Sequence, residues 1–546
     1  EIVSGVSGDF LQKARENDLK GIKGIGDALA QKINELATTG KLEYYEDLRG
    51  EFPDSIFELF EISGLGSKKV KALYEQLGVV SIADLKSACE SGKVAALPGF
   101  AKKSTEKILE AIAFREQNAT RFRLGDVHAV AETILESLRQ HPDAGLVSPA
   151  GSFRRGKETL HDLDFIVSTN HPGAVMDFFI EQPWVENVIV HGQTKSSVHL
   201  EKGLQCDLRA VAPDEYPFAL NYFTGSKEHN VAIRGRARSQ GFTLNEYRLA
   251  PLEEGGAEAP PIQSEEDLYK ALGLVYIEPA LRENGGEIEA AEKDELPRLL
   301  ERENLRGTFH NHTRASDGSN SLEEMAAAAQ ELGLEYLGIA DHSKSSVQAN
   351  GLKEDRLLAQ VEEIKKLNRS LKKEGFRLFT GTECDILSGG KLDFEDDVLS
   401  QLDYVVASVH NQFQLSEKDQ TKRIIKAMEN PHITMIGHLT GRLLLKREPY
   451  PVDVPAIIEA AAETGTWIEL NANPWRLDMD WRWWKLARDK GVLCSINPDA
   501  HTTNGLQHLH FGIEVARKGW LTREDVANCR PLSEIEDLLS RKRQNA

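Results

Sequence analysis

Three aspartates in the first half of the chain have the spacing of a metal-binding set. Asp162 and Asp164 open an apolar, strand-like run, and because alternate residues of a strand face the same side, their carboxylates lie together. Asp207 lies in a second short strand-like run. Carboxylate oxygens are the hard ligands of Mg²⁺ ions that bridge substrate phosphates. Three carboxylates with two metal ions could activate a 3′-hydroxyl and stabilise a leaving pyrophosphate.

An Asp-x-Asp pair alone is more often a solvated strand edge, so the residues before it decide its meaning. Residues 151–156 read Gly-Ser-Phe-Arg-Arg-Gly. A Gly-Ser turn presents backbone N–H groups and a hydroxyl, and Arg155 can add a charge-assisted contact to phosphate. This combination predicts that Ser152 and Arg155 bind phosphate beside the carboxylates.

A second set of ligand-type residues is spread over the last 240 positions. Nearly all of them follow apolar, strand-like runs, which predicts that they meet on one rim of a barrel. Imidazole and carboxylate ligands without thiolate suit Zn²⁺, Mn²⁺ or Fe²⁺. One such histidine would more often be structural, but nine ligand-type residues at strand ends are hard to explain in that way. They are His310, His312, Asp317, His342, Glu383, His410, His438, Asp499 and His501.

A short unit recurs three times in the first 110 residues, at 22–26, 62–66 and 97–101. Each copy has an apolar residue and a Gly-x-Gly turn before an amphipathic helix, although Ala101 replaces the last glycine of the third copy. Glycine allows positive φ, and the N-terminus of the following helix is a seat for phosphate. A helix–turn–helix used only for packing is the alternative. Three copies favour contact with a DNA backbone, through Gly24, Gly26, Gly64, Gly66 and Gly99, with the third copy expected to be the least secure.

The pattern between these motifs changes along the chain. From about residue 121 to 280, short β-rich runs alternate with helices, which predicts an α+β domain. After residue 307, apolar runs alternate regularly with helices, which predicts a barrel-like or doubly wound α/β domain. The expected strands are residues 163–168, 188–190, 208–211, 336–340, 404–409, 467–470 and 492–496. Residues 282–303 are rich in Gly, Glu and Lys and are expected to form a linker between separately folded cores.

Bulk composition limits the class of protein without naming it. A chain of 546 residues with 40% hydrophobic and 28% charged residues predicts several globular domains. No apolar run is long enough to span a bilayer, and the five dispersed cysteines suit a reducing cytoplasm. The net charge of −20 argues against a histone-like DNA binder. Much of that charge lies in residues 251–300, with 13 acidic and 4 basic side chains, so local DNA-binding sites elsewhere remain possible.

Residues 1–280 resemble the family X nucleotidyltransferases, of which DNA polymerase beta is the familiar member. The resemblance rests on residues 151–164, on Tyr-Phe-Thr-Gly-Ser at 222–226, and on Gly-Phe-Thr-Leu-Asn-Glu-Tyr at 241–247. It implies that Asp162, Asp164 and Asp207 hold two Mg²⁺ ions and that Ser152 and Arg155 hold the triphosphate. It also implies nucleotide contacts from Tyr222, Phe223, Gly225 and Asn230, and contact of Arg234 with the template strand.

Two positions qualify this resemblance. His161 stands where the family usually has glycine beside the triphosphate, so nucleotide affinity is expected to differ. Lys32 matches the Schiff-base lysine of the family's small lyase domain, but the tendency of lysine to stay solvated favours a surface or phosphate-contacting role.

The histidine-rich region resembles the polymerase-and-histidinol-phosphatase (PHP) domain family. The resemblance implies a distorted β/α barrel with a three-ion phosphoesterase site, occupied by Mn²⁺ or Zn²⁺, and all nine ligand positions are intact. Asp341, next to His342, is expected to orient a ligand. The tryptophans Trp475, Trp481, Trp483 and Trp484 could stack a splayed DNA end, although packing is the expected role.

The sequence therefore predicts a multidomain enzyme. The expected parts are a partial lyase-like helix-hairpin-helix domain (1–50), a second helix-hairpin-helix domain (51–120), an α+β palm and thumb (121–281), the linker (282–303) and the PHP domain (304–546). The expected function is gap-filling synthesis in base excision repair, with 3′→5′ exonuclease, 3′-phosphatase or abasic-site activity. DNA and dNTPs are the expected partners of a monomer without membrane attachment. The alternatives are a small-molecule phosphatase fused to a DNA-binding module and a non-catalytic scaffold for DNA ends.

Overall fold

The computed structural model describes residues 10–544, apart from positions 17, 20–24, 51 and 63. The chain divides into two compact units. One comprises Glu1–Ala119 with the short segments Asp317–Ser321 and Leu445–Glu448, and the other comprises the rest of the chain. None of the helices that the structure describes combines the length and apolar character that a membrane span requires. The five cysteines are buried free thiols.

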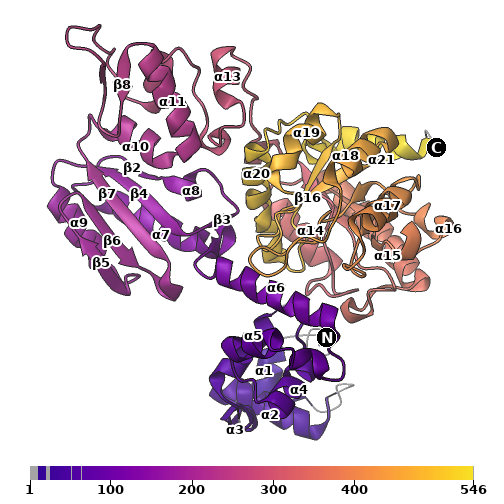
Figure 1. Ribbon diagram of the computed structural model, residues 1–546. Coiled ribbons are helices and arrows are strands. Elements are labelled where there is room, and N and C mark those ends of the chain that lie inside the picture. Colours follow the sequence, from indigo (N-terminus) through magenta and orange to yellow (C-terminus); the bar gives the residue numbers. More distant parts are fainter. Residues whose placement is uncertain (1–9, 17, 20–24, 51, 63, 545–546) are drawn as a thin grey trace. The chain divides into compact units, whose positions relative to one another are not determined.

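The N-terminal unit is built from helices around two small apolar cores, one that includes Leu59, Leu73, Leu85 and Ile112 and a smaller one that includes Ala30. Figure 1 shows these helices at the indigo end of the chain. They are α1 (Phe10–Arg15), α2 (Asp27–Thr39), α3 (Glu43–Gly50), η2 (Asp54–Glu61), α4 (Ser67–Leu77), α5 (Ile82–Glu90), η3 (Val94–Ala96) and α6 (Lys102–Asn118).

The glycine turns of the second and third copies share one geometry at their described residues. Gly64 and Gly99 have φ of 88° and 85°, a region that favours glycine. Two residues later, Gly66 and Ala101 are extended caps that precede α4 and α6. Ala101, with φ of −75°, adopts this conformation without strain, so the third copy keeps the backbone of the second. Gly24 lies outside the described residues.

The second unit begins with a five-stranded mixed sheet, ordered β2-β4-β7-β6-β5. The central pair β4–β7 is parallel and the other pairs are antiparallel. Helices α7 (Leu124–Gln140) and α9 (Pro172–Ile180) pack against this sheet. The strands are β2 (Val147–Pro149), β4 (Asp162–Ser168), β5 (Asn187–His191), β6 (Lys195–His199) and β7 (Gln205–Val211). The short pair β1 (Phe122–Arg123) and β3 (Thr159–Leu160) and the one-turn helix α8 (Gly151–Arg154) complete this region.

A smaller helical layer follows, with its own apolar core around Leu268, Tyr269 and Ile277. It contains a two-stranded hairpin, β8 (Phe242–Leu244) with β9 (Leu249–Pro251). Its helices are α10 (Tyr216–Thr224), α11 (Lys227–Ser239), α12 (Glu265–Ala271), η5 (Pro279–Leu281) and α13 (Glu287–Glu292).

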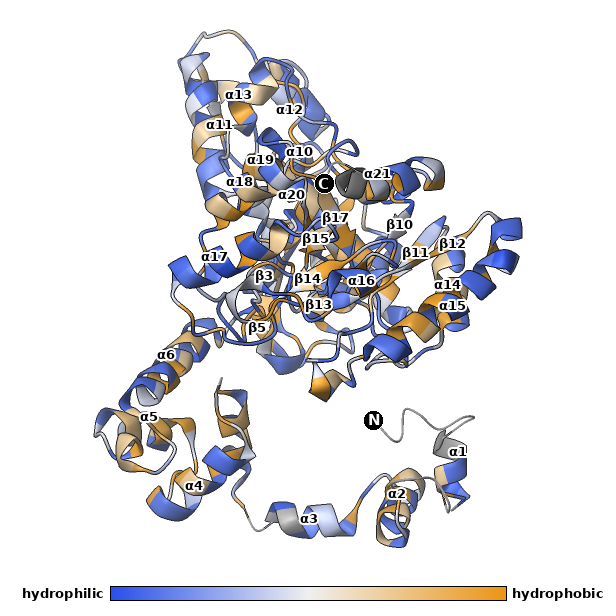
Figure 2. Ribbon diagram, turned by 90° about the vertical axis from the view of Figure 1, so that its right-hand side faces the viewer, coloured by the Kyte–Doolittle hydropathy of each residue, from blue (hydrophilic) through white to orange (hydrophobic). Residues whose placement is uncertain are grey.

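The last 240 residues contain two parallel sheets, ordered β10-β11-β12 and β13-β14-β15-β16-β17. Isolated bridges join the ends of the two sheets, between Asn311 and Ala500 and between His342 and Glu383. In Figure 2 the central strands are largely orange, whereas the flanking helices carry both colours. The strands are β10 (Gly307–Thr308), β11 (Tyr336–Ile339), β12 (Arg377–Thr380), β13 (Glu383–Asp385), β14 (Val406–Ser408), β15 (Met435–Ile436), β16 (Trp467–Asn471) and β17 (Cys494–Asn497). The main helices are α14 (Leu322–Glu331), α15 (Glu354–Leu371), α16 (Asp396–Leu399), α17 (Glu417–Met428), α18 (Val454–Thr464), α19 (Trp484–Asp489), α20 (Leu509–Lys518) and α21 (Leu532–Gln544).

The expectation of separate cores on either side of residues 282–303 is wrong. Buried residues of the mixed sheet and of the parallel sheets form one continuous apolar cluster. At their junction Gly125 packs so closely that a Cβ there would lie 2.4 Å from Pro474. Within the expected linker, Arg282 and Glu287 are fully buried, because their charges are paired with Glu265 and His229. The segment is polar in composition, yet these two charged side chains bind protein groups rather than water.

Candidate active sites

The three predicted aspartates lie on the central strand pair of the mixed sheet. Asp164 of β4 is directly opposite Asp207 of β7, and Asp162 is two residues earlier on β4. From the neighbouring strand β6, Lys195 places its Nζ 2.6 Å from Asp207 Oδ2. The fold therefore brings the three carboxylates to one edge of the sheet and supplies a counter-charge that the sequence did not reveal.

The electrostatics of this edge favour a bound cation. Burial, with the neighbouring charges of Asp162 and Asp207, raises the pKa of Asp164 to about 7. Burial and Asp207 also raise the pKa of Asp162. For Asp207, burial acts upward, but hydrogen bonds from Lys195 and Gln205 bring the net pKa below the usual value. Three acidic groups that resist ionising together fit a divalent cation, which would stabilise their charged forms.

The backbone at position 151 lies so close to the carboxylate of Asp164 that only glycine fits there. Gly151 has φ of 57°, and a Cβ on it would lie 2.2 Å from Asp164 Oδ2. The backbone N–H of Ala150 donates to the carbonyl of Asp164 at 2.7 Å. Ser152, on the next position of α8, is therefore fixed close to the metal-binding edge.

A cavity of about 290 Å³ lies beside this motif. Six of the seven predicted nucleotide-binding residues line this cavity. Lys227 also lines it and adds a positive charge that the sequence did not indicate. Ser152 is not among its lining residues. The lining consists of Arg155, Tyr222, Phe223, Thr224, Gly225, Lys227, Asn230 and Arg234.

Several of these side chains are held by hydrogen bonds. Arg155 donates from Nη1 to the carbonyl of Thr224 at 2.5 Å and from Nε to Glu283 Oε1 at 3.0 Å. Asn230 donates from Nδ2 to the carbonyl of Tyr222 at 2.6 Å. The cavity therefore has a defined shape before any nucleotide is bound.

His161 is exposed and lies outside the lining of this cavity. Its Nε2 is 2.9 Å from Arg121 Nη1, and its Nδ1 is 3.1 Å from the carbonyl of Thr120. An effect of His161 on nucleotide affinity therefore remains a prediction. The ring itself is held by the side chain of Arg121 and the backbone carbonyl of Thr120.

The histidine-rich region forms a second site, centred on the buried carboxylate of Glu383. Glu383 Oε1 lies 2.9 Å from His438 Nε2 and 3.2 Å from His410 Nε2. Glu383 Oε2 lies 2.9 Å from His342 Nδ1 and 3.4 Å from His310 Nε2. One carboxylate thus faces four imidazoles that come from different strand ends.

The remaining predicted ligands adjoin this centre. Asp499 Oδ1 lies 3.2 Å from His312 Nε2 and 3.7 Å from His501 Nδ1. The rings of His312 and His501 stack with their centroids 4.2 Å apart. Ligand atoms within 4.8 Å of one another form three groups: His312, Asp317, His342 and His501; His310, His312 and Glu383; and His342, Glu383 and His410.

Backbone geometry and unpaired atoms indicate that these groups are built for ions. His438 and Asp499 have φ of 25° and 51°, a conformation that residues other than glycine rarely adopt and that concentrates at functional sites. His310 Nε2 and His438 Nδ1 are buried without a hydrogen-bond partner among the described residues. Buried imidazole nitrogens in that state fit metal ligands.

The charges of the cluster are strongly coupled. Burial acts to raise the pKa of Glu383, yet the surrounding histidines, His410 foremost, hold it well below its usual value. Burial acts to lower the pKa of His410, yet Glu383 and Asp385 raise it to about 10. Among the other histidines, burial and neighbouring rings lower the pKa of His312 to about 4. In this cluster the charges of Glu383 and His410 therefore stabilise each other.

Two carboxylates that orient the ligands escaped the sequence analysis. Glu469 Oε1 lies 2.7 Å from His310 Nδ1, and its Oε2 accepts the backbone N–H of His438 at 2.6 Å. Asp385 Oδ1 lies 2.5 Å from His410 Nδ1. Such contacts direct the other ring nitrogen toward the centre. The available signals were a glutamate inside the apolar strand β16 and an aspartate two positions after Glu383.

Asp341 binds the loop that follows His312. Its Oδ1 accepts the backbone N–H of Thr313 at 2.8 Å and the hydroxyl of Ser316 at 2.5 Å. Its Oδ2 accepts from Gln360 Nε2 at 2.5 Å. Asp341 therefore fixes the chain directly after His312, which makes it a positioning residue.

The tryptophans divide by environment. Trp484 is fully buried, Trp481 and Trp483 pack against the apolar cluster, and Trp475 is 44% exposed with the guanidinium of Arg123 over its ring. Packing is thus the observed role of Trp484.

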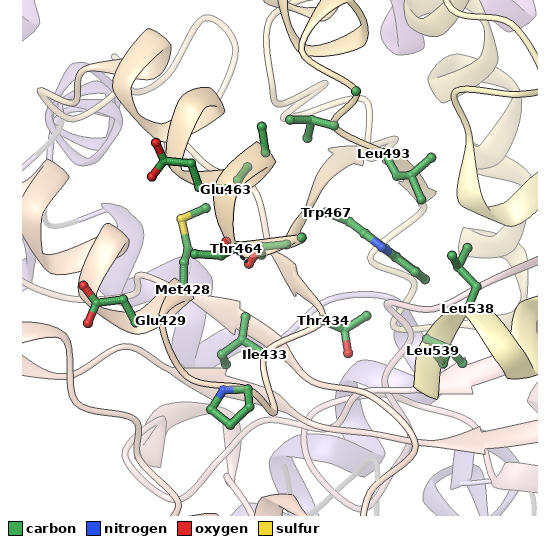
Figure 3. Close-up of a pocket in the computed structure, with 17 residues that line it drawn as sticks. Met428, Glu429, Ile433, Thr434, Glu463, Thr464, Trp467, Leu493, Leu538 and Leu539 are labelled. Atoms are coloured by element: carbon green, nitrogen blue, oxygen red, sulfur yellow. Dashed lines mark hydrogen bonds between the residues drawn. The ribbon is translucent and has the colours of Figure 1, made fainter. Parts of the chain in front are cut away.

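A larger cavity, of about 510 Å³, lies away from this chemistry (Figure 3). Its lining includes Met428, Thr434, Leu493 and Leu538, with Trp467 from the first position of β16. The residues near the ligands, Glu469 and Asn471, come from the other half of that strand. None of the predicted ligands lines this cavity.

Comparisons with known proteins identify three domains of the chain and relatives of it. Family models match at residues 56–113 (SAM-like helix-hairpin-helix tandem), 219–283 (DNA polymerase beta thumb) and 308–473 (PHP domain). The chain is 40% identical to a Bacillus subtilis (strain 168) protein, DNA polymerase/3′-5′ exonuclease PolX, over 96% of this chain and 91% of that one. It is 27% identical to DNA polymerase lambda of Rattus norvegicus over 48% of each chain. It is 28% identical to a probable phosphatase of Thermoanaerobacter sp. (strain X514), over 43% of this chain and 94% of that one.

The helix-hairpin-helix modules, the beta-type thumb and the PHP domain thus occur in one chain. The chain belongs to the family X DNA polymerases that carry a C-terminal PHP domain.

Proposed function

We propose that this chain fills gaps in DNA during repair and removes nucleotides from 3′ ends with its PHP domain. The observation that carries the proposal is the pairing of Asp164 with Asp207 beside Gly151, which opens the motif whose Arg155 lines the cavity of about 290 Å³. This arrangement supplies the carboxylates and the phosphate-binding loop that nucleotidyl transfer needs. The activities of the Bacillus subtilis relative agree with it.

In the polymerase site, Asp162, Asp164 and Asp207 would hold Mg²⁺, which neutralises the charge of the triphosphate when bound. Ser152 and Arg155 bind the triphosphate of a dNTP. Tyr222, Phe223 and Gly225 form the wall beside the sugar, Asn230 contacts the base edge, and Arg234 contacts the template strand. The Lys195–Asp207 ion pair holds Asp207 in place until the metal competes for it.

In the PHP site, the nine ligand-type residues would hold three ions, Mn²⁺ or Zn²⁺, which polarise the scissile phosphodiester when bound. Glu469 and Asp385 keep His310 and His410 oriented, and Asp341 fixes the chain after His312. The reaction is 3′→5′ exonucleolytic hydrolysis, and removal of a 3′-phosphate or cleavage at an abasic site are further reactions for the same centre.

The architecture that we propose has five parts. They are a lyase-like region (1–50), helix-hairpin-helix fingers (51–120), palm and thumb (121–281), a connecting segment (282–303) and a distorted β/α barrel (304–546). Gly26, Gly64, Gly66 and Gly99 place the N-termini of helices against a DNA backbone. Lys32 contacts phosphate, and in the free protein its ammonium lies 3.2 Å from the centroid of the Tyr44 ring. The active species is a monomer.

The test is product analysis on 5′-labelled gapped DNA, with and without dNTPs, in Mg²⁺ and in Mn²⁺. We expect extension of the primer with dNTPs and shortening without them. Hydrolysis of small phosphate esters with neither product would instead support a small-molecule phosphatase joined to a DNA-binding module.

A further inference from the structure

Lys518 is a buried cation at the last position of α20, in the PHP domain. Its side chain is fully enclosed, with a relative exposure of 1% for the whole residue. Burying an ammonium group is costly unless the charge is paired and its donors are satisfied. The position of its partners therefore indicates what the residue does.

Within the PHP domain, Nζ lies 4.9 Å from the centroid of the Trp481 ring, whereas its hydrogen-bond and ion-pair acceptors among the described residues belong to the polymerase half of the chain. Lys518 Nζ lies 2.6 Å from Glu283 Oε1 and donates to the backbone carbonyl of Arg155 at 2.9 Å. A longer contact of 3.4 Å reaches the carbonyl of Ala280. One ammonium group thus joins the end of a PHP helix to the loop that begins at Gly151.

Glu283 extends this contact to the guanidinium of Arg155. The Oε1 atom that accepts from Lys518 also accepts from Arg155 Nε at 3.0 Å, and Oε2 lies 3.6 Å from Lys157 Nζ. Lys518 therefore fixes Arg155 twice, through its backbone carbonyl and through the carboxylate that holds its side chain. Arg155 lines the cavity of about 290 Å³, with its Nη1 bound to the carbonyl of Thr224.

We infer that Lys518 is a positioning residue of the nucleotidyltransferase site: a PHP-domain side chain that holds Arg155 in the geometry required for triphosphate binding. The inference rests on the proposed function of Arg155. Without Lys518, the ion-pair partners left to Glu283 among the described residues are Arg155 and Lys157, and the backbone carbonyl of Arg155 loses the hydrogen bond from Lys518. The arginine then spends part of its time away from the nucleotide cavity, which weakens binding without removing a group that touches the substrate.

Lys485 provides a matched control from the same domain. Its Nζ donates to the carbonyl of Gly285 at 3.0 Å and lies 4.0 Å from the centroid of the Trp520 ring. It therefore makes one comparable contact to residues 282–303. In the described part of the chain, neither Arg155 nor Glu283 is among its partners.

The experiment compares the wild type with Lys518→Met, Lys518→Arg and Lys485→Met in single-nucleotide insertion on gapped DNA, with the nuclease rate measured in parallel. We expect Lys518→Met to raise the KM for dNTP roughly 10-fold or more, with kcat within about 3-fold and the nuclease rate unchanged. Lys518→Arg should recover most of the affinity, and Lys485→Met should resemble the wild type.

If Lys518→Met does not fold, Glu283→Gln tests the same link, because it removes the carboxylate charge that joins Lys518 to Arg155. It should raise the KM in the same way. An unchanged KM in Lys518→Met or Glu283→Gln would overturn the inference, and so would equal loss of synthesis and nuclease activity in Lys518→Met and Lys485→Met. A wild-type protein that shortens primers but inserts no nucleotide would contradict the proposed polymerase function itself, and the inference with it.

Discussion

The two candidate metal sites of this chain differ in how complete they are before any ion binds. In the PHP domain, ligand atoms of the described residues already lie within 4.8 Å of one another, around the buried Glu383. In the palm, Asp207 is instead paired with Lys195, and burial with the charges of Asp162 and Asp207 raises the pKa of Asp164 to about 7. The ligands of the PHP site are thus close together before ions bind, whereas the palm site needs metal and substrate to complete it.

The difference follows from the ligand types. Imidazoles are oriented by one carboxylate each, as Glu469 orients His310, and are stable in close contact while neutral. Carboxylates repel one another, so three of them cannot be brought together without a counter-charge. A site that hydrolyses can therefore hold its ions permanently, while a site that binds a new triphosphate in each cycle can exchange Mg²⁺ with it.

The largest expected effect is the loss of synthesis in Asp207→Ala. Removing a carboxylate from a two-metal site leaves charge unneutralised in the transition state, so primer extension should fall roughly 1,000-fold or more. Primer extension and nuclease assays on one substrate check this. The nuclease rate should stay within about 3-fold of the wild type. Ordinary extension by a well-folded variant would refute the palm assignment.

The reciprocal variant is His342→Ala, which removes a histidine 2.9 Å from Glu383. Shortening of the 3′ end should fall at least about 100-fold, because the ligand set is broken, whereas nucleotide addition should be largely retained. Gel analysis beside Asp162→Ala completes the comparison. If Asp162→Ala lost the nuclease and His342→Ala kept it, hydrolysis would belong elsewhere.

A smaller effect tests whether the carboxylates that orient the histidines, such as Glu469, hold the ligands of the PHP site in place before ions bind. Glu469→Gln weakens the orientation of His310, and we expect roughly 10- to 100-fold lower Mn²⁺ affinity, measured by metal titration. Glu463→Gln, an exposed glutamate of α18, is the control and should not change the affinity. Equal affinities for all three proteins would show that Glu469 does not support the ligands.

The smallest effect concerns stability in metal-free protein. Because burial raises the pKa of Asp164 to about 7, above the usual value near 4, the native state keeps a proton that the unfolded state releases. Stability contributed by this group is present at low pH and is lost as pH rises toward 7. Asp164→Asn should therefore raise Tm by a few degrees at pH 8 and by less at pH 5. Thermal unfolding in EDTA measures this, with exposed Asp214→Asn as the control.

Local patterns predicted much of this molecule. The run at 163–168 is strand β4, the run at 467–470 is β16, and six predicted nucleotide-binding residues line one cavity. Strand alternation and loop motifs are local properties, which a sequence displays directly. The strands that carry Asp164 and Asp207 were therefore recognisable before their pairing was known.

Contacts between distant residues were not predictable in this way. Lys195, Glu469 and Lys518 are ordinary charged residues in sequence, and only the fold places them against Asp207, His310 and Arg155. The composition of residues 282–303 also led to a wrong prediction. Its polar residues indicated a solvated linker, but Arg282 and Glu287 are buried in ion pairs. Burial of charge depends on partners that lie far away in the chain.

Trp520 follows α20 in the PHP domain, yet it belongs to the apolar core of the thumb, together with Leu281 and Ala291. A lineage that no longer needed the nuclease could lose its histidines one at a time, since each substitution would affect hydrolysis alone. Deleting the domain would be a different event, because it would remove part of the thumb core along with it. We therefore expect descendants of such a chain to include polymerases that retain an inactive PHP domain as a scaffold.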